Sequence, residues 1–192
     1  MKKLFSIALA LLFVAISTYA APVIGVYADE MATDCAIQIE PYTTEILYVV
    51  ASWPVTEFPE GITAIEFKVN GLPLPSEYPI GLIKVFPYET EAVIGDIWTD
   101  YSLAWNEPVG GDKGWWVIAT IEITMFSAIW IAEDTHLLPT AGDSCGCFIV
   151  VDHEFEVHDA WGMPSFLRAT QELPCGYMEP ENESWSDIKV LY

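Results

Sequence analysis

The stretch that decides the fold reads WWVIATIEITMF and runs from Trp115 to Phe126. Apolar residues occupy every second position of this stretch, and the positions between them carry a mixture of polar and apolar side chains. The residues expected on the first face are Trp115, Val117, Ala119, Ile121, Ile123 and Met125. Because successive side chains of a β-strand point to opposite faces of the sheet, this alternation predicts one long, half-buried strand.

Further stretches alternate in the same way or are rich in Val, Ile, Thr and aromatic residues, which strands favour. They are residues 23–28, 36–40, 45–52, 64–70, 82–88, 94–99, 129–132, 148–158 and 188–192. Proline and glycine indicate turns between them, at Pro54, 58–61, 71–79 and 106–114. Residues 160–173 contain Pro164 and predict a loop with at most a short helix. We therefore predict an all-β chain, a single two-sheet β-sandwich of the immunoglobulin-like kind with long loops.

The composition supports a packed domain and excludes several classes of partner. Hydrophobic residues make up 53% of the chain, which is enough to bury a core and argues against a disordered acidic protein. The 28 acidic residues outnumber the 7 basic ones, and the formal net charge is -21. Such a chain repels phosphate, so we expect it to bind neither nucleic acid nor an anionic membrane surface.

The first twenty residues have the pattern of a secretory signal peptide. Lys2 and Lys3 precede an apolar run from Leu4 to Ile16, and small residues lead up to Ala20. We expect cleavage after Ala20, so that residues 1–20 are the signal peptide and residues 21–192 form the sandwich domain. The protein is then secreted, to the periplasm or to the exterior of the cell.

Export places the four cysteines in an oxidising compartment, where disulfides are the default. Pairing Cys145 with Cys147 across one residue closes a very small ring, so this connectivity ranks last. Strand parity places Cys35 and Cys147 on core faces. We therefore predict disulfides between Cys35 and Cys147 and between Cys145 and Cys175. A zinc site is the alternative, but the ligand spacing of zinc ribbons is missing.

Parts of the sequence resemble known proteins. The strand pair at Ile46–Val50 and Ile62–Val69 resembles the opening strands of cohesin-like bacterial modules. The segments Ile24–Glu30 and Ser184–Tyr192 resemble the ends of uncharacterised secreted proteins of environmental bacteria. This resemblance implies a secreted β-sandwich and carries no established activity.

Residues 153–158 read HEFEVH, which looks at first like a zinc-protease motif. That motif needs its two histidines four residues apart on one helical face, and these are five apart. In a strand, His153 and His158 point to opposite faces, so we expect His153 in the core and His158 on an acidic outer face. Asp29, Glu30 and Asp34 cluster near the first strand but match no calcium loop. The sequence predicts no metal site and no cofactor.

Signatures of nucleophilic catalysis are missing from the sequence, which has no Gly-x-Ser-x-Gly elbow and no Ser-x-x-Lys motif. The eight tryptophans are the remaining candidates for a binding role. An exposed indole on a sheet can stack on a sugar ring, and Trp98, Trp105 and Trp116 are the candidate ligand-binding residues. The alternative is that these rings pack beneath long loops, because Ile118 and Phe126 share the face of Trp116.

The sequence therefore predicts a secreted, non-catalytic binding or structural module of the cell envelope or exterior, with an extracellular glycan or protein as partner. One alternative is a carbohydrate-binding module that uses exposed tryptophans. The other is a carboxylate-dependent glycoside hydrolase, in which two acidic side chains face each other across a cleft.

Overall fold

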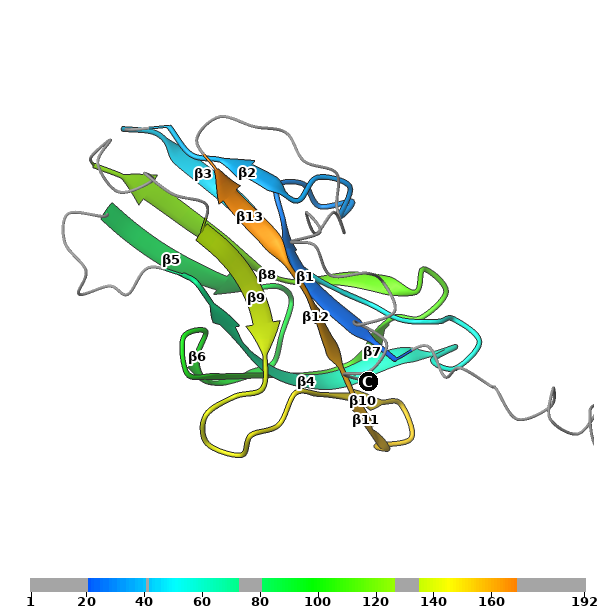
Figure 1. Ribbon diagram of the computed structural model, residues 1–192. Coiled ribbons are helices and arrows are strands. Elements are labelled where there is room, and N and C mark those ends of the chain that lie inside the picture. The colour runs from blue at the N-terminus through cyan, green and yellow to red at the C-terminus, as the bar shows by residue number, and fades with distance from the viewer. Residues whose placement is uncertain (1–20, 41, 73–80, 127–134, 169–192) are drawn as a thin grey trace, which may run out of the picture.

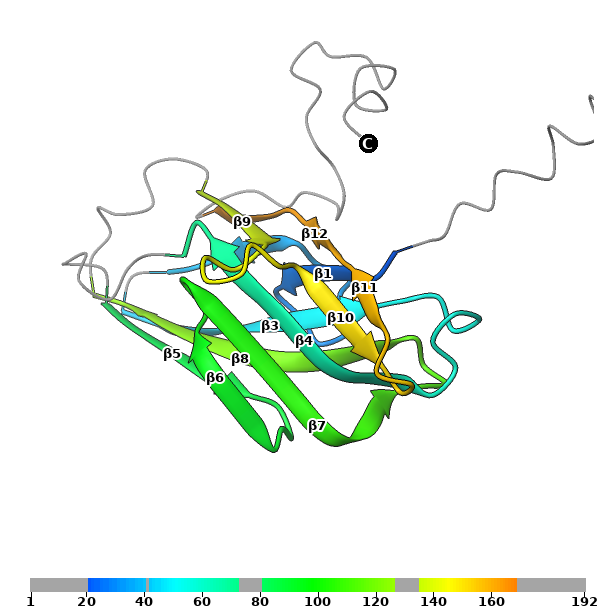
Figure 2. The same ribbon diagram turned by 90° about the horizontal axis from the view of Figure 1, so that it is seen from below.

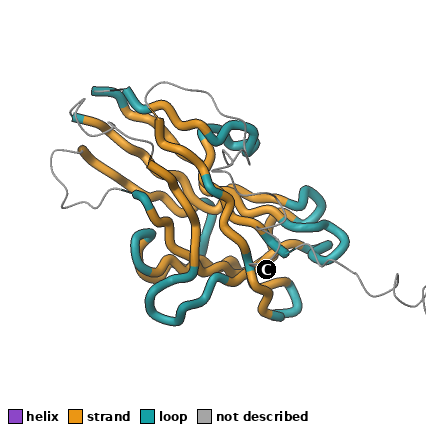
Figure 3. Tube along the Cα trace, in the orientation of Figure 1, coloured by secondary structure: helices purple, strands orange, loops and turns teal. Residues whose placement is uncertain are grey.

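The computed structural model describes residues 21–40, 42–72, 81–126 and 135–168. All regular secondary structure in these residues is β-strand, so the predicted all-β class is confirmed (Figure 3). The predicted signal peptide, the predicted strands at 129–132 and 188–192, and Cys175 lie outside the described residues. No helix in the described part of the chain is long and apolar enough to cross a membrane.

Two sheets pack face to face as a sandwich (Figures 1 and 2). The first is a five-stranded sheet with the strand order β12-β1-β3-β8-β5. Its strands are β12 (Trp161–Met163), β1 (Val23–Tyr27), β3 (Thr44–Ser52), β8 (Trp115–Met125) and β5 (Gly81–Pro87). All neighbours in this sheet are antiparallel except β1 and β12, which are parallel.

The second sheet contains eight strands. They are β2 (Ala36–Gln38), β4 (Gly61–Asn70), β6 (Ala92–Asp96), β7 (Asp100–Gly110), β9 (Thr135–Thr140), β10 (Ile149–Asp152), β11 (Val157–Asp159) and β13 (Ser165–Arg168). The order β11-β10-β4-β9-β13-β2 forms one path, and β7 pairs with β4 and with β6 beside it. Figure 2 shows β10, β4, β7 and β6 side by side as one layer.

The core lies between the two sheets. The five-stranded sheet contributes Leu47 and Ile121, and the other sheet contributes Ile65 and Phe67, all at most 2% exposed. Phe67 meets the ring of Tyr101 edge to face, with the ring centroids 5.8 Å apart. Burial raises the pKa of Tyr101 to about 12, which fits a phenol held in the apolar interior.

Strand β8 confirms the sequence pattern over most of its length but not over all of it. Ala119, Ile121 and Ile123 are fully buried, as the alternation predicts. The pairing with β3 skips Ile118, because Val49 lies opposite Ala119 and Val50 lies opposite Val117. This bulge reverses the parity of the strand start, since a bulged residue has no partner across the ladder. Trp115 and Val117 therefore join a second, smaller cluster around Tyr27, Cys35 and Val50.

Other expectations are also wrong. β7 extends to Gly110, into the stretch 106–114 that was expected to be a turn, and residues 97–99, expected in a strand, form the turn between β6 and β7. Residues 148–158 form two strands and not one, because the carboxylate of Asp152 accepts the backbone N–H groups of Glu154 and Glu156 and holds a turn. Residues 160–168, expected to be a loop, contain β12, which forms the edge beside β1, and β13, which lies between β9 and β2.

Candidate binding face

The outer face of β10, β4, β7 and β6 carries two rows of side chains that run across the strands, one apolar and one mixed. The first row consists of Val151, Ala64, Ala104 and Ala92, which are paired in register. The second row consists of Ile149, Glu66, Ser102 and Ile94. We call these eight residues the binding face. They line a shallow groove of about 190 Å³.

The depth of this groove follows from the size of the side chains. Alanines at the centre of the first row leave the sheet surface low, because each one extends a single methyl group from the backbone. Ile94 rises at one side and is 72% exposed, which is unusual for a large apolar side chain. A low apolar floor with a raised edge is typical of a surface that accommodates a partner.

Glu66 is the charged group at the centre of the binding face. Its Oε2 accepts a hydrogen bond from Oγ of Ser102 at 3.1 Å. The nearest lysine along the strand, Lys68, is occupied by an ion pair with Asp143. Among the described residues, the ion pairs are Lys68–Asp143 and Asp152–His158, so Glu66 has no cationic partner there.

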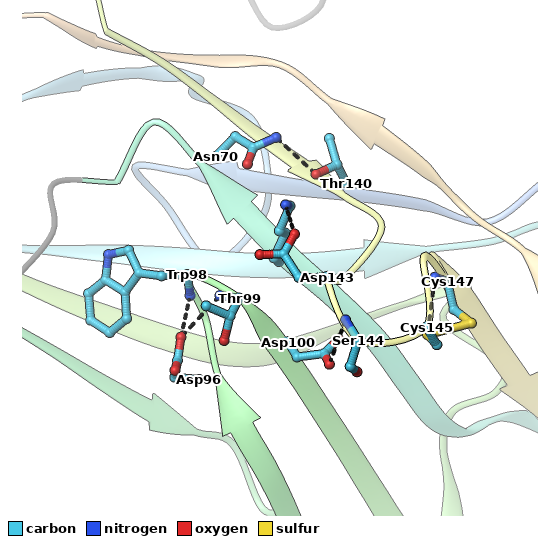
Figure 4. A network of polar contacts seen from close by, with 11 residues as sticks. Asn70, Asp96, Trp98, Thr99, Asp100, Thr140, Asp143, Ser144, Cys145 and Cys147 are labelled. Atoms are coloured by element: carbon cyan, nitrogen blue, oxygen red, sulfur yellow. Dashed lines mark hydrogen bonds and ion pairs between the residues drawn. A yellow bond between two sulfur atoms is a disulfide. The ribbon is translucent and has the colours of Figure 1, made fainter.

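Polar contacts border one end of the binding face (Figure 4). Oδ1 of Asp96 accepts the backbone N–H of Trp98 at 2.9 Å and that of Thr99 at 3.0 Å. Oδ2 of Asp100 accepts the backbone N–H of Ser144 at 3.2 Å. These contacts fix the β6–β7 turn and the loop after β9 against the same sheet.

The structure does not assemble the three candidate tryptophans into one platform. Trp98 lies in the turn before β7, whereas Trp105 and Trp116 line a second groove near the other end of that strand. This second groove has a volume of about 420 Å³ and is acidic, because Glu89, Glu91 and Glu107 also line it.

The two indoles in the second groove are already engaged. Trp105 is 6% exposed, and its Nε1 donates a hydrogen bond to the carbonyl of Tyr88 at 3.3 Å. Trp116 is partly buried against the main core, and the ammonium of Lys113 lies 5.1 Å from the centroid of its ring. Packing therefore accounts for most of the surface of both rings.

The cysteine pairing differs from the prediction. Cys145 is bonded to Cys147, the connectivity that ranked last, so the predicted pairs Cys35–Cys147 and Cys145–Cys175 are corrected. The tight loop after β9 explains the difference, because Gly146 adopts a positive φ of 65° and its N–H reaches the carbonyl of Gly142. The Cα atoms of the two cysteines are consequently 5.1 Å apart, within the range of disulfides.

His158 and Asp29 make contacts within the chain, whereas His153 is half-buried and its Nδ1 has no hydrogen-bond partner among the described residues. Nε2 of His158 lies 2.7 Å from Oδ2 of Asp152, and its ring meets Phe58 edge to face. The carboxylate of Asp29 accepts the backbone N–H groups of Met31, Thr33 and Asp34, so it organises the loop before β2.

Sequence reasoning missed Glu66 and the alanines of the binding face. Strand β4 alternates between the buried Ile65 and Phe67 and the outward-facing Ala64, Glu66 and Lys68. These outward positions could therefore be predicted from the sequence. Ser102 and Ala104 on β7 were missed because residues 100–105 were not expected to form a strand, although they alternate in the same way.

Comparisons with known proteins give the class of fold. No family model matches the chain, and no curated protein matches its sequence. The fold is similar to that of the sixth cohesin of scaffoldin B from Acetivibrio cellulolyticus, solved in complex with a dockerin. The identity is 10%, the match covers 79% of this chain and 100% of that one, and the TM-score is 0.50.

A second similar structure is that of a CaDoc0917–CaCohA2 complex, with 12% identity, a TM-score of 0.45, and coverage of 76% of this chain and 99% of that one. The similarity to the scaffoldin B cohesin gives the protein a cohesin-like, two-sheet β-sandwich fold, as the resemblance of its strand pair implied.

Proposed function

We propose that the chain is a secreted, non-catalytic module that binds a protein through the binding face. The cohesin-like fold supports this class of function, because the similar solved cohesin is itself in complex with a protein, a dockerin. The partner we expect presents a small apolar patch that seats on the alanine row. Beside that patch it presents a lysine or arginine that reaches Glu66.

The observation that carries the proposal is the carboxylate of Glu66 within an apolar surface. A partner that covers the binding face removes water from this carboxylate, which is costly unless a donor or cation takes its place. Ser102 satisfies only one of the lone pairs of the carboxylate. A guanidinium or ammonium group of the partner supplies the missing hydrogen bonds together with the opposite charge.

The charge of the whole chain favours the same kind of partner. With a net charge of -21, the protein repels acidic proteins and attracts basic ones over distances of about 10 Å at moderate salt. Mutating a charge at the edge of such an interface changes mainly the association rate. Mutating Glu66, at the centre of the binding face, is expected to change mainly the dissociation rate.

The experiment compares proteins retained by three immobilised forms of the chain. The exported proteins of the source cells are passed over the wild type, over Ala104→Arg and over Thr120→Arg. Ala104→Arg fills the groove and opposes a basic partner, whereas Thr120→Arg places the same side chain on the outer face of the five-stranded sheet. The Cel5 dockerin with which the similar cohesin was solved serves as a second, defined probe.

A partner that binds the wild type and Thr120→Arg, but binds Ala104→Arg at least about tenfold more weakly, supports the proposal. Glu66→Gln should weaken the same complex and reduce its salt dependence. Equal binding to all three forms, or loss of binding in Thr120→Arg alone, would place the interface elsewhere.

A carbohydrate site is the second candidate, and the acidic groove beside Trp105 and Trp116 is what favours it. Carboxylates and indoles together are typical of sugar-binding grooves, since the former accept hydroxyl hydrogen bonds and the latter stack on apolar ring faces. Retardation of the protein by soluble polysaccharides in affinity gels, lost in Trp116→Ala, would support this candidate over the protein-binding one.

A glycoside hydrolase remains the third hypothesis, without a contact that favours it. Asp152 is the buried acid of the second sheet, and its pKa is lowered, whereas a general acid needs a raised pKa. Export likewise stays a proposal. It predicts that the mature protein recovered outside the cytoplasm begins at Ala21, which N-terminal sequencing checks.

A further inference from the structure

The disulfide between Cys145 and Cys147 lies at the surface, beside the binding face. It occupies the loop between β9 and β10, and Cys145 is exposed (Figure 4). Its sulfur contacts Oε1 of Glu66. An external thiol therefore has direct access to this bond, whereas the sulfur of Cys35, which is also in a disulfide, is fully buried.

This disulfide contributes little to the stability of the fold. The stabilisation that a cross-link gives through chain entropy increases with the length of the closed loop, and here only one residue separates the two cysteines. The loop is also fixed by other contacts. The N–H of Asp143 donates to the carbonyl of Thr99 at 2.8 Å, and the N–H of Ser144 donates to Asp100 at 3.2 Å. The loop thus keeps its place when the bond opens.

The surroundings of Cys145 favour the reduced form. A disulfide sulfur has no hydrogen to donate, so it gains no hydrogen bond from the carboxylate of Glu66. The thiol of reduced Cys145 can donate to Oε1 of Glu66. Groups that stabilise the reduced form make a disulfide more oxidising.

We propose that Cys145 and Cys147 form a thiol–disulfide exchange site, which oxidises exposed dithiols of exported proteins or small thiols. The external thiolate attacks Sγ of Cys145, the bond to Cys147 breaks, and Cys147 leaves as a thiolate that takes a proton from water. A second external thiolate then attacks the external sulfur of the mixed disulfide and releases Cys145. The external pair loses two electrons, and the cysteine pair of this chain gains them. This activity does not depend on the proposed partner of the binding face.

The first experiment uses the disulfide of Cys35 as an internal reference. The folded protein is incubated with reduced glutathione for increasing times, free thiols are alkylated, and each cysteine is quantified by peptide mass spectrometry. Cys145 and Cys147 are expected to be reduced at least about tenfold faster than Cys35, while the circular dichroism spectrum stays folded. Reduction of all cysteines together, or only on unfolding, would overturn the proposal.

A matched pair of variants tests which sulfur is attacked. Cys147→Ser leaves Cys145 as the exposed thiol and should trap a mixed disulfide with glutathione. Cys145→Ser leaves the more shielded Cys147 and should trap less. Glu66→Ala, in which both cysteines are kept, should shift the redox equilibrium of Cys145 and Cys147 towards the disulfide. An unchanged equilibrium in Glu66→Ala, or equal trapping by the two serine variants, contradicts the assigned roles.

Discussion

Asp152 accepts a hydrogen bond from Nε2 of His158 at 2.7 Å, across the turn that joins β10 to β11. Asp152 is 6% exposed, and its other oxygen accepts the backbone N–H groups of Glu154 and Glu156. Burial by itself raises the pKa of Asp152, but the hydrogen bonds from His158 and the two backbone groups outweigh it, with the charge of His158 adding to them. The pKa is therefore lowered from 3.8.

This relationship predicts how stability depends on pH. A carboxyl group whose pKa is lower in the folded than in the unfolded state stabilises the fold above the unfolded pKa, about 3.9. The contribution declines as the pH falls from there through the folded pKa. Asp152→Asn is expected to lower the free energy of unfolding by about 1–3 kcal/mol near pH 7.

Urea unfolding of the wild type and Asp152→Asn between pH 7 and pH 2 measures this effect. The difference between the two proteins should shrink below about pH 4, where the unfolded carboxyl becomes protonated. The same difference at every pH would mean that the charge of Asp152 has no part in it.

Two glycines with positive φ differ in the space around them, and this difference predicts different costs of substitution. A Cβ at Gly61 would lie 2.0 Å from the carbonyl oxygen of Val109, in the paired strand β7. A Cβ at Gly146 would meet no atom within 4 Å. Both alanine variants adopt an unfavourable backbone conformation, which costs about 1 kcal/mol. Gly61→Ala must in addition push two strands apart.

We therefore expect Gly61→Ala to lower the midpoint of thermal unfolding by at least twice as much as Gly146→Ala does. Calorimetry of both variants measures it. Equal shifts would show that β4 and β7 separate without cost at this point.

The sequence was informative where alternation is regular and side chains are large. The pattern of β8 was sufficient to predict a sandwich, since Ile121 and Ile123 can only face a core in a strand of that length. It failed at the bulge around Ile118, because a bulge depends on how the partner strand β3 is paired. The binding face could not be predicted for a different reason, since Ala64, Ala92 and Ala104 come together only when three strands are paired in register.

The turn at Asp152 and the pairing of the cysteines show a further limit. Phe155 adopts a positive φ of 64°, which a bulky residue rarely does, so a turn at this position could not be predicted from the residue type. The cysteine prediction used strand parity for Cys35 and Cys147, which fails for Cys147 because it lies in the loop before β10. Local backbone geometry, and not the apolar pattern, decides both features.

Phe67 and Phe86 offer a test of where the core lies. Phe67 is fully buried and packs against Tyr101, whereas Phe86 on β5 is 44% exposed. Phe67→Ala is expected to lower the free energy of unfolding by about 3–5 kcal/mol, because it leaves a cavity between the sheets. Phe86→Ala should cost less than about 1 kcal/mol, as surface substitutions do. If chemical unfolding showed a similar loss of unfolding free energy for both variants, β5 would have to contact a further part of the chain.

The last prediction concerns the partner of Cys35. Cys35 is in a disulfide and lies in the small cluster with Tyr27 and Val50. Cys145 and Cys147 are bonded to each other, so Cys175, outside the described residues, is the one cysteine of the sequence left for Cys35.

Because this bond closes a long loop, it should contribute far more stability than the bond between Cys145 and Cys147, about 4–5 kcal/mol in the chain-entropy model. Peptide mapping without reduction should give a linked peptide that contains Cys35 and Cys175. The variant Cys35→Ser should unfold at a much lower temperature than Cys145→Ser/Cys147→Ser. A peptide that links Cys35 to Cys145 or Cys147 would overturn both this pairing and the exchange site, because the two share one assignment of the four sulfurs.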